Sequence, residues 1–587
     1  MDLKSESDFY VGCRAFAPVA AYFGLSIDKF NFLFCQIAFL LFSFPYRLLL
    51  HPSRVSPTTR HAVALSVGLV FGFFCFGYQI LHLVAQATLV YVIILFASPE
   101  SMHKIALVVG MAYLSAIHIM RQIYDYGGYH LDVTGPLMVA TQKVTSIAFN
   151  LHDGLSEKRD IILHPEQRRQ MISRLPSPLE FYSYILHYQT LMCGPLVFFN
   201  DYLDFIRGRQ FLRHSVRTGL RGNPTQITEP SPNWETARKL FISFLSALSI
   251  VYLLSAYPIE YITQDEFLHK RNRLSQMLYI IWATSLHRHR YYHAWILGEA
   301  ICNAAGFGFN GYTSDGKARW NLISNVDIVT IETSTSLREL LIAWNKSTQT
   351  WLRTVSYERV RRHRTQLTFV LSAMWHGFYP GYYLTFGTGI FFTLGARAVR
   401  RSVRPFFQGS RRSRKLYDLL TCLATRVAVG YMVFPFLLLD FQSSIKVYRH
   451  FWFVGHVVCL LAMYVLPKVL PLSLHVASRS TVSTTATPPN EEGSHPARDD
   501  LRKRDRPPAD QKHDQGGEDH DQQQAGTETD ETSTESIFAA EPKESSSALT
   551  LLTEGYVPEQ PRVQEPAAIG CSRRELHELQ VGDKKNQ

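Results

Sequence analysis

Two regions of opposite character follow one another along the chain. Residues 1–476 contain repeated apolar runs rich in Phe, Leu, Tyr and Val, whereas residues 477–587 contain almost none. Apolar runs of about 17 residues or more match the hydrocarbon thickness of a bilayer when they fold as helices. The pattern predicts an all-α polytopic membrane protein with about ten to twelve transmembrane or re-entrant helices, preceded by a lead-in or interfacial segment at 1–27 and spanning 28–472.

The apolar runs predict nine separate spans, and one of them is interrupted. A Gly-Pro pair at 194–195 predicts a helix break inside one of them. We find no 20–50-residue repeat, so the inverted repeats typical of many transporters are not indicated. The predicted spans are 30–50, 61–83, 84–98, 105–123, 180–199, 240–256, 274–286, 417–439 and 451–470.

Residues 124–154 are less regular than the spans around them. They mix Asp125, His130, Asp132 and Lys143 with apolar positions and glycines. Polar backbone at membrane depth persists only where it is buried in protein or lines a cavity. This stretch therefore predicts either a cavity wall or an interfacial loop that leads into one helix.

Two strongly basic loops, 353–364 and 397–416, bracket a short apolar segment. The positive-inside rule places both loops on the cytosolic side, so the segment between them must enter the membrane and return. Pro380 and Gly381 supply a turn. The segment is thus predicted to be a helical hairpin entered from the cytosol, with His376 deep in the membrane near its apex.

Charge is distributed as unevenly as hydropathy. The whole chain carries 60 Lys and Arg against 49 Asp and Glu, while residues 477–587 carry 13 against 22. A basic, aromatic body suits either nucleic acid or a membrane, and the long apolar runs decide for the membrane, so no nucleic acid partner is expected. The eight cysteines are scattered without CxxC spacing, which is typical of small buried hydrophobes rather than disulfides or zinc ligands.

The segment 344–386 holds the candidate chemistry. His376 lies between Trp375 and Gly377 in an apolar run, and Asn345 follows Trp344. An ionisable side chain at membrane depth is by default a functional-site hypothesis. One histidine and one asparagine do not make a metal site with three protein ligands, and no metal is expected. A neutral histidine can instead act as a general base, and an asparagine amide can donate to a developing oxyanion.

Each of these residues also has a plainer interpretation. His376 can be a buried histidine whose ring bonds a backbone carbonyl. Asn345 can be an ordinary helix N-cap, and Asn345-Lys346-Ser347 is also a glycosylation sequon. Ser372, four residues before His376, lacks a nucleophile-elbow motif and fits a packing role.

The run WNKSTQTWLRTVSYERV followed by LSAMWHGFYPGYYLTF resembles the membrane-bound O-acyltransferase family, in particular its lysophospholipid acyltransferase branch and the subgroup of domain-containing members one and two. HLDVTGPLMVATQKVTSIAFNLHDG, GPLVFFNDYLDFI and YYHAWILGEAICNAAGFGFNGY extend the likeness over about 25–470. The sequence LIAWN departs from the aromatic-Asp-Trp-Trp-Asn run of the sterol and diacylglycerol branches.

The resemblance implies a helical body around a tunnel, with His376 as the active-site histidine and Asn345 as its partner. It implies an acyl-CoA-dependent acyltransferase for lysophosphatidylethanolamine, lysophosphatidylserine or lysophosphatidylcholine, which prefers an unsaturated acyl-CoA such as oleoyl-CoA. Acyl-CoA is then a co-substrate, and no cofactor is expected. Further candidates for substrate binding are Trp344, Trp375, Arg353, Tyr357, Arg359, Arg362, Glu299 and Asn303.

Two other classes remain open at this point. A carrier or channel would use His376 as a proton-relay residue, and a scaffold would recruit partners through its acidic tail. Arg359 and Arg362 suit the CoA phosphates, but positive-inside anchoring explains them equally well. Glu299 and Asn303 are four residues apart and therefore share one helical face.

The segment 477–587 is rich in Ser, Thr, Gln, Glu, Asp and Pro, so it cannot bury enough apolar surface to fold, and we expect it to be disordered. Lys584 and Lys585 stand fourth and third from the end, as in a dilysine retrieval signal. The N-terminus lacks the pattern of a cleavable signal peptide. These features predict a multi-pass protein of the endoplasmic reticulum membrane with a cytosolic C-terminal tail.

Overall fold

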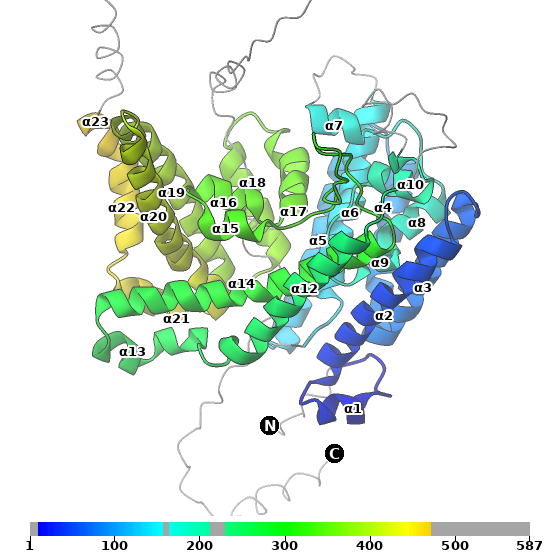
Figure 1. The fold of residues 1–587 in the computed structure, drawn as a ribbon, viewed down its shortest axis with the longest axis horizontal. Coiled ribbons are helices and arrows are strands. Elements are labelled where there is room, and N and C mark those ends of the chain that lie inside the picture. Colours follow the sequence, from blue (N-terminus) through cyan, green and yellow to red (C-terminus); the bar gives the residue numbers. More distant parts are fainter. Residues whose placement is uncertain (1–9, 129, 157–163, 212–228, 471–587) are drawn as a thin grey trace, which may run out of the picture.

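The computed structural model describes residues 10–128, 130–156, 164–211 and 229–470, and Figure 1 shows them as an assembly of helices. In these ranges the only β-type pairing is an isolated bridge between Tyr312 and Ala318. The all-α class predicted from the hydropathy pattern is confirmed. The predicted tail, 477–587, lies outside the described residues.

The described N-terminal half contains five long helices, α2 to α6, and several short ones. The spans predicted at 61–83 and 84–98 are α3 and α4, which a 3₁₀ turn joins into one apolar stretch of 40 residues. The helix break predicted at the Gly-Pro pair is confirmed, because irregular chain separates α9 from α10. The elements are α1 (Ala17–Tyr22), α2 (Ile27–Leu49), α3 (Pro57–Phe76), η2 (Gly77–Gln79), α4 (Ile80–Phe96), α5 (Met102–Tyr124), α6 (Thr134–Leu155), α7 (Pro165–Gln170), α8 (Pro178–Leu186), α9 (Tyr188–Leu191) and α10 (Phe199–Ile206).

The C-terminal half is built around one 32-residue helix, α14, and a second group of long helices. The predicted span at 274–286 was too short, since α14 continues without a break through Glu299 and Asn303. The elements are α12 (Asn233–Ser249), η4 (Ile250–Leu254), η5 (Ile259–Thr263), α13 (Asp265–Lys270), α14 (Arg273–Ala304), α15 (Ile328–Thr333), α16 (Leu337–Ala343), α17 (Lys346–Leu352), η6 (Arg353–Tyr357), α18 (Arg364–His376), α19 (Pro380–Val403), η7 (Arg404–Phe407), α20 (Arg411–Leu438), α21 (Phe441–His450), α22 (Val454–Tyr464) and α23 (Leu466–Val469).

Five helical stretches of the described chain are long and apolar enough to cross a membrane, or six if the bent pair α21 and α22–α23 forms one span. The other helices are too short or too polar to count as membrane spans. α18 has only 13 residues, and α14 carries Arg288, Arg290 and Glu299. Polar helices of this kind are stable in a membrane protein only inside the helical body. The chain is therefore an integral membrane protein with a polar interior.

Helix α6 is the centre of that interior. Every residue from Pro136 to Leu151 is buried, although the helix includes Gln142, Lys143 and Asn150. Residues 124–154 are thus a short connection that leads into one helix, as the second of the two predictions has it, and most of that helix is enclosed by protein. A helix that is buried on all sides must satisfy its polar side chains within the protein.

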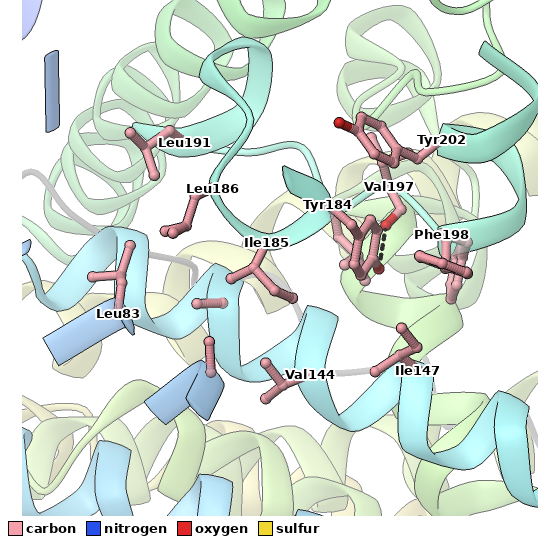
Figure 2. Close-up of a cluster of buried hydrophobic side chains, with 14 of the residues drawn as sticks. Leu83, Val144, Ile147, Tyr184, Ile185, Leu186, Leu191, Val197, Phe198 and Tyr202 are labelled. Carbon is pink, nitrogen blue, oxygen red and sulfur yellow. Dashed lines mark hydrogen bonds between the residues drawn. The ribbon is translucent and has the colours of Figure 1, made fainter. Parts of the chain in front are cut away.

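One side of α6 packs against the short helices α8 to α10. Val144 and Ile147 contact this group in an apolar cluster, in which the Tyr184 hydroxyl donates to the Val197 carbonyl at 2.8 Å (Figure 2). The ammonium group of Lys143 lies on the same side. It donates to the Tyr184 and Ile185 carbonyls and to Thr190 Oγ1, at 3.0–3.1 Å and 2.9 Å. A cation at the carbonyl end of α8 offsets the unpaired carbonyls and the negative pole of that helix.

Another face of α6 binds the segment from α17 to α18 through a row of polar contacts. The α6 positions in this row are spaced four, three and eight residues apart, so they lie along one face of the helix. The contacting pairs are Trp375 Nε1 with the Met138 carbonyl at 3.0 Å, Gln142 Nε2 with Thr348 Oγ1 at 2.9 Å, Trp351 Nε1 with Thr145 Oγ1 at 2.8 Å, and Arg359 with Asp153, two bonds of 2.7 Å. We call these four pairs the α6 contact row.

The Asp153–Arg359 pair tests how strongly this row holds the fold. The Asp153 side chain is 2% exposed, so Asp153→Ala leaves a half-buried guanidinium without its counter-ion. We expect a loss of about 3 kcal/mol in the free energy of unfolding, measured as a lower Tm in detergent. Glu266→Ala is the control, because it removes an exposed pair with Lys270 and should cost less than about 1 kcal/mol. Equal Tm values for the two variants would contradict a structural role for the row.

Candidate active site

The predicted hairpin near His376 is present, and a second hairpin precedes it. α17 and η6 run in one direction and α18 returns, so the chain reverses in the basic loop around 359–363. Three contacts fix the register. Arg364 lies 4.9 Å over the Tyr357 ring, Ser356 Oγ is 3.2 Å from Thr368 Oγ1, and the Trp351 and Trp375 rings are 5.9 Å apart.

This register places the two residues that the sequence singled out at the same end of the hairpin. Seven residues of α17 and five of η6 oppose the 13 residues of α18. Asn345 immediately precedes α17 and His376 is the last residue of α18, so both lie at the open end of the hairpin. The basic loop lies at the closed end, about 20 Å away at 1.5 Å per helical residue.

The His376 ring is held in a defined tautomer. Its Nδ1 lies 2.7 Å from the Ser372 carbonyl oxygen, and because a carbonyl only accepts, Nδ1 carries the proton. Nε2 is therefore an unprotonated acceptor. It is buried and has no hydrogen-bond partner among the described residues. The plainer interpretation, a ring bound to a carbonyl, thus holds for one nitrogen and leaves the other available.

Aromatic side chains surround the His376 ring. The ring centroids of Phe386, Phe436 and Tyr382 lie 5.0, 5.7 and 6.3 Å from that of His376. These three residues belong to the hydrophobic cluster of the C-terminal half, whereas neighbouring Trp375 belongs to the cluster of the N-terminal half. His376 consequently lies at the boundary between the two clusters, in a site with little water to compete for its lone pair.

Asn345 adopts a left-handed backbone conformation, with φ 42° and ψ 54°. Asparagine tolerates this region better than most residues. Its amide makes no capping bond to α17 and no other hydrogen bond within the described part of the chain, so it is not an ordinary N-cap. Only 3% of the residue is exposed, which leaves the sequon inaccessible to glycosylation in the folded protein. Asn345 therefore presents an unused donor and acceptor.

A buried polar network holds the start of α17, and with it Asn345. Asn325 accepts from Lys346 N at 2.9 Å and from Ser347 Oγ at 2.7 Å. The backbone N–H of Asn325 donates in turn to Glu299 Oε1 at 2.6 Å. Glu299 Oε2 forms an ion pair with Lys239 Nζ at 3.1 Å, with both side chains at most 5% exposed.

Glu299 and Asn303 were predicted to bind substrate, and the structure places both of them in this network. Asn303 Oδ1 accepts from Lys239 Nζ at 2.8 Å, and the Asn303 amide donates to the Phe307 carbonyl at 3.0 Å. The shared helical face predicted for the pair is confirmed, because both contact the same lysine. Their contacts connect α12 and α14 to the loop before α15, whose Asn325 holds the start of α17, and this gives them a structural role.

The other substrate-binding candidates fall into two groups. Trp344 and Trp375 are at most 2% exposed and pack in aromatic clusters, Trp344 against Tyr291, Tyr292 and Trp295 of α14. The remaining candidates surround the closed end of the hairpin. Arg359 is paired with Asp153, Arg353 contacts Glu358 at 3.3 Å, Tyr357 lies under Arg364, and Arg362 is exposed.

Sequence reasoning missed His118, which lies in the predicted span 105–123. His118 Nε2 donates to the Trp375 carbonyl at 3.1 Å, and its ring packs against Gly377, whose φ of 120° suits glycine. The signal was present, since His118 is an ionisable residue in an apolar helix. Gln142, Thr145 and Asn325 gave no such signal, because their partners are remote in the sequence.

Comparison with known proteins shows the family of the chain. Residues 118–434 match the model of the membrane-bound O-acyltransferase family. The chain is 44% identical over 468 residues to lysophospholipid acyltransferase 6 of Drosophila melanogaster, covering 79% of this chain and 65% of that protein. It is 41% identical to membrane-bound glycerophospholipid O-acyltransferase 1 of Mus musculus, with 78% and 93% covered, and 40% identical to membrane-bound glycerophospholipid O-acyltransferase 2 of Homo sapiens, with 78% and 88% covered.

The apolar helices around a polar, enclosed interior define an integral membrane protein whose candidate site lies inside the helical body. Together with the matches, this makes the protein a membrane-bound acyltransferase. The chain belongs to the membrane-bound O-acyltransferase family. The family resemblance carried by the WNKS and WHG segments is confirmed.

The Lys239–Glu299 pair predicts a specific non-additivity. Lys239→Met leaves the Glu299 carboxylate buried without a cation, which costs about 3–5 kcal/mol. Lys239→Met/Glu299→Gln removes the uncompensated charge and should regain much of that loss. Thermal unfolding of the two variants in detergent measures the difference. A double variant no more stable than Lys239→Met would show that the ion pair contributes little.

Proposed function

We propose that the protein transfers an acyl group from acyl-CoA to the free hydroxyl of a lysophospholipid. The observation that carries the proposal is the unpartnered, buried Nε2 of His376, which is the acceptor nitrogen of the neutral ring because Nδ1 donates to the Ser372 carbonyl. The relatives of the chain that are named lysophospholipid acyltransferases and glycerophospholipid O-acyltransferases support the substrate class.

In the proposed reaction, His376 is the general base and no covalent enzyme intermediate forms. The hydroxyl oxygen attacks the thioester carbonyl carbon while its proton moves to Nε2. The carbon–sulfur bond then breaks, and the proton passes from His376 to the departing sulfur. The products are the ester and the free thiol of CoA, and the chemistry needs no cofactor.

Asn345 is proposed as the partner that stabilises the developing negative charge. Its amide lies at the same end of the hairpin as His376 and has no protein partner in the described chain. A preorganised donor near a tetrahedral intermediate lowers the barrier because it needs no reorientation during the reaction. Ser372 is not a nucleophile in this scheme, since it offers His376 its carbonyl rather than its hydroxyl.

The basic loop at the closed end is proposed to bind the phosphates of CoA. Arg362 suits this role better than Arg359, because Arg362 is exposed whereas Arg359 is committed to Asp153. The pantetheine arm of CoA would then run along the hairpin toward His376. Lysophosphatidylethanolamine, lysophosphatidylserine and lysophosphatidylcholine are the proposed acceptors, and oleoyl-CoA the proposed donor, in phospholipid remodelling at the endoplasmic reticulum.

A carrier that uses His376 as a proton relay is disfavoured by the same geometry. A relay requires a chain of hydrogen-bonded titratable groups, and in the described residues His376 Nε2 has no such neighbour. A panel of lysophospholipid head groups against labelled acyl-CoAs, assayed with the purified protein, tests the proposed activity and its preferences. Absence of acyl transfer across the whole panel would refute it.

Loss of the base should abolish turnover without unfolding the protein. His376→Ala is expected to lower the rate of acyl transfer about 10²- to 10⁴-fold. The control is His82→Ala, which removes a half-buried histidine on α4 whose one hydrogen bond to the described residues is with the Tyr113 hydroxyl. This control should retain nearly all activity. Near-normal turnover in His376→Ala at equal levels of inserted protein would rule out the proposed role.

The left-handed backbone of Asn345 allows its amide to be tested separately from its conformation. Asn345→Gly keeps access to positive φ but removes the amide, whereas Asn345→Ala removes the amide and adds about 1 kcal/mol of backbone strain. Both variants should lose about 10²- to 10³-fold in rate, and only Asn345→Ala should be less stable. An active Asn345→Gly would mean that the conformation matters and the amide does not.

A further inference from the structure

The turn between α19 and α20 carries a concentrated positive charge that the proposed reaction does not use. Six of its seven basic side chains are exposed, and Arg404 is half-buried. None of the seven takes part in an ion pair with the described part of the chain. By contrast, Arg174, Arg288 and Arg359 each form an ion pair with a carboxylate. This basic tip consists of Arg400, Arg401, Arg404, Arg411, Arg412, Arg414 and Lys415.

The described chain ends beside this basic tip. α22 runs parallel to α19, since Thr388 contacts His456 at 3.0 Å and Gly395 faces Cys459 further along. The next turns of the two helices bring α23 against α19, close to the tip, as Figure 1 also shows. The tail therefore begins, after Leu470, on the same side of the molecule as the tip.

The tail contains a stretch of opposite charge. Residues 510–541 include ten Asp and Glu and only one Lys, Lys512. About 40 residues separate this stretch from Leu470, and a chain of that length reaches up to roughly 135 Å when fully extended, which is more than enough to return to the tip. Such a tether holds its end near its origin at an effective concentration on the order of millimolar.

We propose that the acidic stretch 510–541 docks on the basic tip of the same molecule. Opposite charge provides the attraction, and the attachment point beside the tip makes the contact intramolecular. The tether makes the tail a better candidate ligand of the tip than an anionic lipid surface, because the tail is attached beside the tip whatever the lipid composition. Exposed charges attract one another through water, so the contact should weaken steeply with salt.

The experiment uses the full chain with a protease recognition sequence inserted between residues 480 and 500 and an affinity tag at the N-terminus. The protein is loaded on the affinity resin to a local concentration on the order of millimolar, which replaces the effective concentration that the tether supplies before cleavage. After cleavage in neutral detergent on this resin, the released tail fragment is measured in the bound and eluted fractions. The fragment should stay bound at about 50 mM salt and elute at about 500 mM, because the Debye length falls from about 14 Å to about 4 Å.

Two matched variants locate the contact. Arg411→Gln/Arg412→Gln should weaken retention roughly tenfold, as expected for two lost charge pairs. Lys270→Gln/Arg271→Gln removes the same charge from the C-terminal end of α13 and the residue after it, and should leave retention unchanged. α13 lies at the far end of the α19–α20 pair in Figure 1. Neutralising Glu518, Asp519 and Asp521 should reproduce the loss from the tail side.

Three results would overturn the proposal. The first is a fragment that elutes freely at low salt, and the second is equal retention by the Arg411→Gln/Arg412→Gln and Lys270→Gln/Arg271→Gln variants. The third is unchanged retention in Arg411→Gln/Arg412→Gln together with weaker binding of that variant to vesicles containing phosphatidylserine. That last result would assign the tip to an anionic lipid surface. Acyl transfer is not part of the readout, so failure here leaves the proposed function intact.

Discussion

The α6 contact row is the interaction on which the rest of the site depends. A helix enclosed on all sides must satisfy its polar groups inside the protein, and α6 does so by bonding the segment from α17 to α18. Each contact fixes one level of the hairpin, from Trp375 at the open end to Arg359 near the closed end. The register of the hairpin is thus set by the need to satisfy the polar groups of the α6 contact row, because this register gives them their partners.

From that register follow the properties of the open end. Because α18 terminates at His376 with Gly377 in a left-handed conformation, the histidine ring can fold back onto the carbonyl one turn earlier. Hydrogen bonding at Nδ1 then leaves Nε2 as the free acceptor, which is the state that a general base requires. The position at the boundary of two hydrophobic clusters keeps the lone pair away from bulk water.

Buried charges elsewhere in the protein also fix how the helices are arranged, through ion pairs and hydrogen bonds. Lys143 is held by helix carbonyls, and Lys239 by Glu299 and Asn303, so that each cation joins elements that are distant in the sequence. Removing one partner of a buried pair costs more than removing both, so these residues specify one arrangement more than they add stability. The network through Asn325 extends this constraint to the start of α17.

The sequence alone determined the fold class, the family, the helical hairpin and the prominence of His376 and Asn345, because hydrophobic periodicity, loop charge and local motifs are properties of neighbouring residues. It did not determine where 124–154 would lie, that α14 is continuous, or that Glu299 and Asn303 bind a lysine. Those features depend on partners 60 or more positions away, such as Lys239 for Asn303 and Thr348 for Gln142. Only the tertiary structure decides which polar side chains meet, because a buried polar group must form a hydrogen bond and its partners are the groups that packing places next to it.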